Sequence, residues 1–153
     1  MNIETKYHGT VQLSQLALVS FENGLPGFEH EKQFALLPIH DSPFTILQSV
    51  QNKDVAFVMI EPFSYFPTYE VELDDTTCDQ LKIQKENDVA LYVILTVAEP
   101  FTNTTANLQA PVVINVHERI GKQVILTNTP YKTKHRLFQK RLRRNKEARI
   151  CLC

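Results

Sequence analysis

The residues best suited to chemistry lie in a short acidic run near the middle of the chain. Residues 69–74 read Tyr-Glu-Val-Glu-Leu-Asp, so every second residue is a carboxylic acid. Successive side chains of a strand point to opposite faces, which predicts that the three apolar residues face the core and the acids line the outer face. Two further acids follow in the next few residues. The acidic candidates are Glu70, Glu72, Asp74, Asp75 and Asp79.

Carboxylates in this arrangement have two interpretations. They form either a solvated face that keeps the protein in solution, or a docking surface for a basic partner, because complementary charge accelerates encounter and sets specificity. The alternation by itself favours the solvated face.

The opposite charge is concentrated at the C-terminal end. Residues 132–153 hold nine Lys or Arg and one Glu, a balance of +8, whereas residues 1–131 hold seven Lys or Arg and sixteen Asp or Glu, a balance of −9. A basic segment can bind phosphates, so a nucleic-acid-binding protein acting through this tail is the alternative function. The acidic body would repel nucleic acid, and the tail has no aromatic platform for base stacking. We therefore expect a mobile appendage and no direct nucleic-acid binding.

Motifs for catalysis and metal binding are missing from the sequence. Its four glycines do not make a phosphate-binding or dinucleotide-binding loop. Its five histidines are scattered, and none lies three or four residues from another His or from a Cys. Cys151 and Cys153 form a terminal Cys-x-Cys without a second pair. We expect no enzymatic activity, no cofactor and no bound metal.

The elements that must position these residues are predicted to be short strands. Segments rich in Val, Ile, Phe, Tyr and Leu recur between Gly, Pro, Asn and Asp turns. Strands are expected near residues 3–7, 11–21, 33–38, 44–50, 55–60, 68–73, 89–97, 111–117 and 123–127. This spacing predicts an all-β fold, an antiparallel barrel-like (pseudobarrel) folded sheet.

Two helices complete the predicted fold. One short helix follows the acidic run, with Asp74 or Asp75 as its N-cap and with Cys78 and Leu81 facing inward. The second is a basic helix over residues 135–150. The predicted organisation is one β domain over residues 1–135 and a basic C-terminal tail over residues 136–153.

The bulk composition is that of an ordinary globular domain. The chain has 153 residues, 43% hydrophobic and 22% charged, and fits one domain. The N-terminal residues lack a basic-then-apolar signal segment, and no apolar run reaches the ~20 residues of a membrane span. We expect a cytoplasmic protein with reduced cysteines, no membrane contact, and a monomeric free state.

Four segments resemble a known family. They are residues 21–28 (Phe-Glu-Asn-Gly-Leu-Pro-Gly-Phe), 44–49 (Phe-Thr-Ile-Leu-Gln-Ser), 105–115 (Thr-Ala-Asn-Leu-Gln-Ala-Pro-Val-Val-Ile-Asn) and 123–126 (Gln-Val-Ile-Leu). With Lys-Tyr-His-Gly at 6–9 and Glu-Pro-Phe at 61–63, the chain resembles the bacterial FliW family of flagellar assembly factors over about residues 3–135. The stretch 136–153 lies outside the resemblance.

The resemblance implies an all-β barrel-like fold and a role in binding other proteins. FliW proteins bind newly made flagellin, and they bind CsrA, the RNA-binding regulator that represses flagellin translation. FliW freed by flagellin export captures CsrA, so translation resumes. A partner with a basic RNA-binding surface makes an acidic docking surface physically sensible. The resemblance therefore shifts the interpretation of the acidic run to a docking surface.

The segment before Pro111 is a second candidate for partner binding. Proline lacks a backbone N–H, which places it at a strand start or on an edge strand. An edge strand here would accept a partner peptide by strand addition, and a buried structural role is the equal alternative. We expect Asn107 and Gln109 to belong to the partner-binding site.

Overall fold

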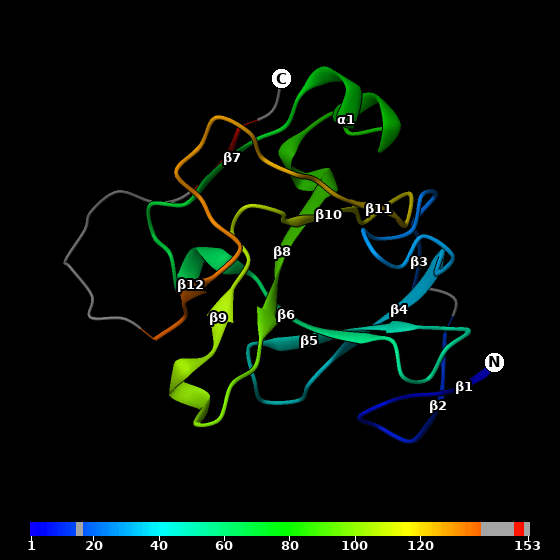
Figure 1. Ribbon diagram of the computed structural model, residues 1–153. Helices are drawn as coiled ribbons and strands as arrows, with labels where there is room; N and C mark the ends of the chain where they lie inside the picture. The colour runs from blue at the N-terminus through cyan, green and yellow to red at the C-terminus, as the bar shows by residue number, and fades with distance from the viewer. Residues whose placement is uncertain (15–16, 139–148, 152–153) are drawn as a thin grey trace.

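The computed structural model describes residues 1–14, 17–138 and 149–151, and its main body is a closed β-barrel (Figure 1). Seven strands follow one another around the barrel in the order β10, β11, β3, β4, β5, β6, β8, and β8 pairs with β10 to close it. Their bounds are Leu18–Ser20 (β3), Gln33–Pro38 (β4), Phe44–Ser49 (β5), Ala56–Ile60 (β6), Val89–Thr96 (β8), Val112–Asn115 (β10) and Ile120–Gln123 (β11). The prediction of an all-β, barrel-like fold is confirmed.

The seam between β3 and β11 differs from the other pairings of the described barrel strands, which are antiparallel as predicted. These two strands run parallel and meet through one residue pair, Ser20 with Ile120. The ring of Phe21 packs across the seam against Gly121, where an added Cβ would lie 2.8 Å from Phe21 Cζ. A glycine is therefore required for this close approach.

The barrel wall is apolar on both faces, which explains the long apolar run of β8. Leu91, Val93 and Leu95 are buried in a core that includes residues of β7 and α1, whereas Tyr92 and Ile94 pack toward a second core. That second core combines residues of five barrel strands. Burial of successive residues on opposite faces removes the usual alternation of apolar and polar residues.

The remaining elements surround this barrel. Their bounds are Asn2–Glu4 (β1), Thr10–Gln12 (β2), Pro62–Ser64 (η2), Glu70–Glu72 (β7), Asp75–Gln80 (α1), Glu86–Asp88 (η3), Phe101–Asn103 (η4), Thr105–Ala106 (β9), His135–Arg136 (β12) and Arg149–Cys151 (β13). β7 and β13 form a separate two-stranded sheet, and Figure 1 shows β7 and α1 together at the top of the barrel. No helix of the described residues has the length and apolar character that crossing a membrane requires.

The strand expected over residues 3–7 is observed at Asn2–Glu4, and two other predicted strands differ most from the observed ones. The strand expected over residues 11–21 is divided into β2 and β3, and the backbone N–H of Ala17 donates to Ser14 O (3.1 Å) between them. The strand expected over 123–127 begins earlier, at Ile120, and ends at Gln123. The first difference is a division of the expected strand and the second is a shifted boundary.

The helix predicted over residues 135–150 is wrong at both of its ends, which are strands. His135–Arg136 pairs with β9, and Arg149–Cys151 pairs with β7. Leu137 is only 3% exposed, and its backbone N–H donates to Thr104 O (3.0 Å). Residues 139–148 of the predicted helix lie outside the described residues. At both ends, pairing with strands of the body outweighs the local sequence pattern, which favoured a helix.

Candidate protein-binding groove

The acidic strand β7 has the predicted alternation of buried and exposed residues. Tyr69, Val71 and Leu73 are at most 1% exposed, while Glu70 is half-buried and Glu72 is exposed. The apolar side chains fix β7 to the core, so its acids are presented on the outside of the molecule.

A second segment runs beside β7 and completes a groove. The backbone N–H of Glu70 donates to the hydroxyl of Tyr131 (3.0 Å), and the rings of Tyr69 and Tyr131 meet edge to face with centroids 4.7 Å apart. Tyr69 donates its own hydroxyl to Leu108 O (2.7 Å), and burial, with the nearby Tyr131, raises the pKa of Tyr69. The two Tyr131 contacts hold the C-terminal end of residues 124–131 against the acidic strand.

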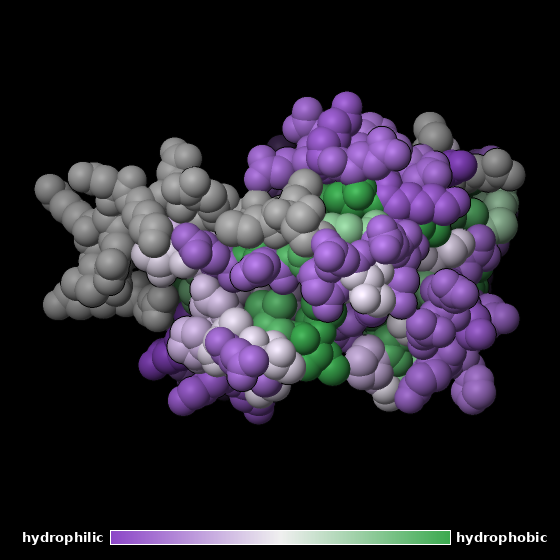
Figure 2. Space-filling model, turned by 90° about the horizontal axis from the view of Figure 1, so that it is seen from above, coloured by the Kyte–Doolittle hydropathy of each residue, from purple (hydrophilic) through white to green (hydrophobic). Residues whose placement is uncertain are grey.

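The groove between these two segments has a volume of about 540 Å³, and its two walls differ in chemical character. One wall is acidic and the other includes apolar side chains, of which Ile125 is 60% exposed. We call this feature the acidic groove; it is lined by Glu70, Glu72, Asp74 and residues 124–131. Figure 2 looks onto this end of the molecule and shows an apolar area among hydrophilic side chains. A segment that carries both basic and apolar side chains would fit such walls.

Asp74 lines the groove and also begins the adjoining helix. Its carboxylate accepts the backbone N–H of Thr77 (2.8 Å), which makes it the N-cap of α1. Hydrogen bonds from Thr77, with the Lys122 ammonium adding to them, lower the pKa of Asp74, so it is ionised at neutral pH. Asp75 and Asp79 are exposed on α1 and do not line the groove. Of the two predicted caps, the structure selects Asp74, and Cys78 and Leu81 are buried as predicted.

Asn107 and Gln109 do not line the acidic groove. The side-chain oxygen of Asn107 accepts the backbone N–H groups of Gln109 and Ala110 (both 3.1 Å), which fixes a turn. The backbone of Gln109 donates to Lys132 O (3.2 Å) and accepts from Leu126 N (2.7 Å). Both residues therefore support the segment that forms the apolar wall.

The proposed edge strand after Pro111 is wrong. Val112–Asn115 pairs with β8 on one side and with β11 on the other, so it offers no free edge for a partner peptide. Pro111 is buried next to this strand. The alternative interpretation, a buried structural role for Pro111, is correct.

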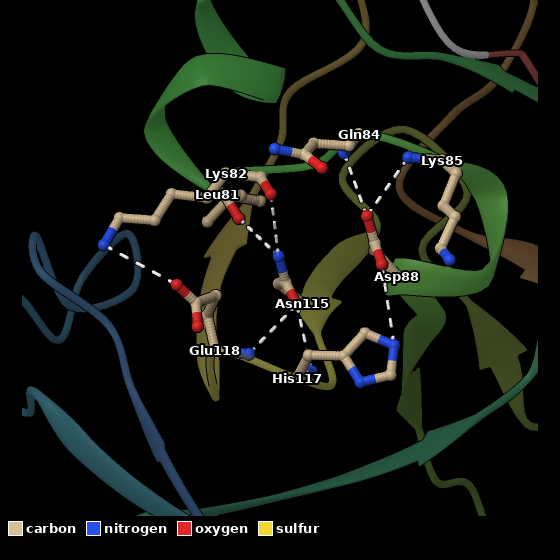
Figure 3. A network of polar contacts seen from close by, with 8 residues as sticks. All are labelled: Leu81, Lys82, Gln84, Lys85, Asp88, Asn115, His117 and Glu118. Carbon is tan, nitrogen blue, oxygen red and sulfur yellow. Dashed lines mark hydrogen bonds and ion pairs between the residues drawn. The ribbon is translucent and has the colours of Figure 1, made fainter.

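A buried amide that sequence reasoning missed connects the helix to the barrel (Figure 3). Asn115, 1% exposed, donates through Nδ2 to Leu81 O (2.7 Å) and Lys82 O (3.2 Å). Its Oδ1 accepts the backbone N–H groups of His117 (3.0 Å) and Glu118 (3.1 Å). A polar residue directly after the apolar run Val112–Ile114 was the available signal. Asn115 holds the end of α1, and with it the acids of the helix, against the barrel.

Asp88 fixes the neighbouring turn in the same network. One of its oxygens accepts the backbone N–H groups of Gln84 (2.9 Å) and Lys85 (3.1 Å), and the other lies 3.5 Å from His117 Nε2 (Figure 3). The bond from Gln84 is the main reason that the pKa of Asp88 is lowered. Among the described residues, no group of three His, Cys, Asp or Glu is placed to hold a metal ion.

Comparison with known proteins agrees with this architecture. The family model described as FliW protein matches residues 2–137. The flagellar assembly factor FliW of Anoxybacillus flavithermus is 96% identical over 138 residues, which cover 90% of this chain and 95% of that protein. The factor of the same name from Bacillus subtilis is 46% identical over 136 residues, which cover 88% of this chain and 95% of the relative.

A solved structure supports the same assignment. A crystal structure of the flagellar assembly factor FliW superimposes with a TM-score of 0.88 at 64% sequence identity, and the match covers 93% of this chain and all of that one. These relatives are named as assembly factors and not as enzymes. The chain belongs to the FliW family of flagellar assembly factors.

Proposed function

We propose that this protein works in the cytoplasm by binding two other proteins, flagellin and the translational regulator CsrA. Binding of CsrA relieves the repression of flagellin translation, and flagellin competes for the same pool of assembly factor. The observation that carries the proposal is the acidic groove, with acidic side chains on one wall and exposed apolar side chains on the other. A free monomer that exchanges partners is the expected form.

Charge supports CsrA as the partner of the acidic groove. A protein that binds RNA presents basic side chains, and carboxylates on a rigid strand attract them over roughly 10 Å at 0.1 M salt. Because Tyr69, Val71 and Leu73 fix β7, its acids lose little conformational freedom when a partner docks.

An apolar surface elsewhere supports flagellin as a separate partner. Phe101 and Phe138 are 39% and 41% exposed, and their ring centroids lie 5.5 Å apart. Phe44 and Tyr65 contact the same pair of rings. Clustered exposed aromatic residues are typical of protein-binding surfaces and suit an apolar partner segment.

The test is to reverse the charge of the acidic wall without touching the helix cap. The double variant Glu70→Lys/Glu72→Lys should slow association with purified CsrA by about tenfold or more in low salt, because two attractions become repulsions. The difference should shrink at 1 M salt, where the Debye length is only ~3 Å. Stopped-flow association at both salt concentrations measures the effect.

The matched control is Glu29→Lys/Asp54→Lys, which changes the net charge equally at exposed residues outside the groove. This control should associate with CsrA at nearly the wild-type rate. A folded groove variant with an unchanged on-rate would show that the acidic strand is only a solvated face.

A further inference from the structure

The edge of the acidic strand is occupied by the chain's own C-terminal residues. β7 is not part of the barrel sheet, and its strand partner among the described residues is β13. The two strands run parallel, with Arg149 opposite Glu70, Ile150 opposite Val71 and Cys151 opposite Glu72. The strand that lines the acidic groove is thus already paired.

The pairing joins the two oppositely charged parts of the chain. β13 belongs to residues 132–153, which carry a balance of +8, and β7 carries acids of the −9 body. The family model ends at residue 137, so β13 comes from outside the family match. An unpaired strand edge accepts extended segments through main-chain hydrogen bonds, and flanking charges select among them.

We propose that β13 is an intramolecular competitor that covers the edge of β7 and must leave before a basic, extended segment of a partner can pair there. This inference rests on the proposed function of the acidic groove and adds its regulation. Because the competitor is tethered to the groove, it faces the strand at a high effective concentration, and it slows partner binding without any change in the groove itself.

The test removes the strand pairing and keeps every charge. In the full chain, Ile150→Pro deletes a backbone N–H and cannot continue the ladder, whereas the control Ile150→Val retains it. Hydrogen exchange of the β7 amides should be faster in the proline variant than in the valine variant. Equal exchange in the two chains would overturn the pairing.

A peptide probe then measures whether the edge is available. The probe is a synthetic peptide of residues 140–153 with Cys151→Ser and Cys153→Ser, which prevents disulfide formation. It should bind the Ile150→Pro chain about tenfold more tightly than the Ile150→Val chain, and adding Glu70→Lys/Glu72→Lys should abolish the difference. Equal affinity for the two chains would overturn the competitor.

Association of CsrA with the same two chains separates this inference from the proposed function. Faster association with the proline variant supports the competitor. CsrA binding to neither chain, with the peptide still binding the proline variant more tightly, would contradict the proposed function and support the role of β13 as a competitor. CsrA binding to both chains at the same rate, with equal peptide affinity for the two, would contradict the role of β13 as a competitor and support the proposed function.

Discussion

At the scale of single residues, Asp74 combines two roles that substitution can separate. Its carboxylate lines the acidic groove, and the same group accepts the Thr77 N–H that begins α1. An asparagine can keep the cap but not the charge, and an alanine keeps neither. The residue therefore allows binding and stability to be measured independently.

We predict that Asp74→Ala lowers the Tm by a few degrees, because α1 loses its cap, whereas Asp74→Asn leaves the Tm nearly unchanged. Both variants should reduce the rate of CsrA association by similar factors, because both remove the same charge. Thermal melts and association kinetics of the two proteins check this. Equal Tm values for both variants would contradict the capping role.

His135 makes the stability of the C-terminal segment depend on pH. Its Nε2 accepts the backbone N–H of Lys132 (2.7 Å), which only a neutral imidazole can do. Burial, with Lys132 adding to it, lowers the pKa of His135. The unfolded chain therefore binds this proton more tightly than the folded one does, and stability falls as the proton is taken up.

We predict that the free energy of unfolding decreases as the pH falls through about 6.5, the ordinary pKa of histidine, toward the lowered value. His135→Gln should make this part of the pH profile flatter, as measured by urea denaturation between pH 7.5 and pH 5. The control is His40→Gln, since the His40 side chain is 95% exposed. The pKa values of Asp74 and Asp88 are lowered as well, so protonation of these two carboxylates decreases the free energy of unfolding in a separate window, below about pH 4. Profiles that stay parallel for wild type and His135→Gln would exclude this role of His135.

At the scale of elements, local sequence patterns correctly predicted the features that depend on neighbouring residues only. The alternation in residues 69–74 placed the buried and outward residues of β7 correctly, and the acid before α1 was a correct cap. The second wall of the groove was not predictable, because Tyr131 meets Glu70 across 61 residues of sequence. The pairing of β13 with β7 likewise depends on contacts between distant segments that no local pattern encodes.

The connection between α1 and the barrel depends on one buried amide. We predict that Asn115→Ala destabilises the fold by roughly 2–4 kcal/mol, because it removes the partner of the buried Leu81 carbonyl, of the half-buried Lys82 carbonyl and of two backbone N–H groups. Hydrogen exchange should become faster at the C-terminal end of α1. Urea denaturation measures the first effect, and Asn103→Ala, at an exposed residue, is the control. A loss no larger than that of the control would argue against the role of Asn115.

At the scale of the whole molecule, we propose that the β domain extends slightly beyond residues 1–135, the range that the sequence predicts for it. Leu137 is buried, and the ring of Phe138 lies against Phe101 and Tyr65. The family model also reaches residue 137. We therefore place the boundary relevant to truncation after Phe138.

We predict that a chain ending at Phe138 keeps a cooperative urea transition close to that of the full protein. A chain ending at Lys134 should lose about 2–3 kcal/mol or more, because it lacks β12 and the buried Leu137 side chain. Comparison of the two transitions checks the boundary. Equal stability of the two truncated chains would mean that the body ends before β12.

The parallel seam has a consequence for how the protein is made. Ser20 of β3 and Ile120 of β11 are 100 residues apart, so the ribosome adds about 100 residues between the two strands that meet at this seam. At typical synthesis rates of 5–20 residues per second, β3 waits roughly 5–20 s with an open edge. Contacts this distant in sequence also slow folding, and open strand edges invite association with other chains. The nascent protein is thus exposed to aggregation until β11 has emerged.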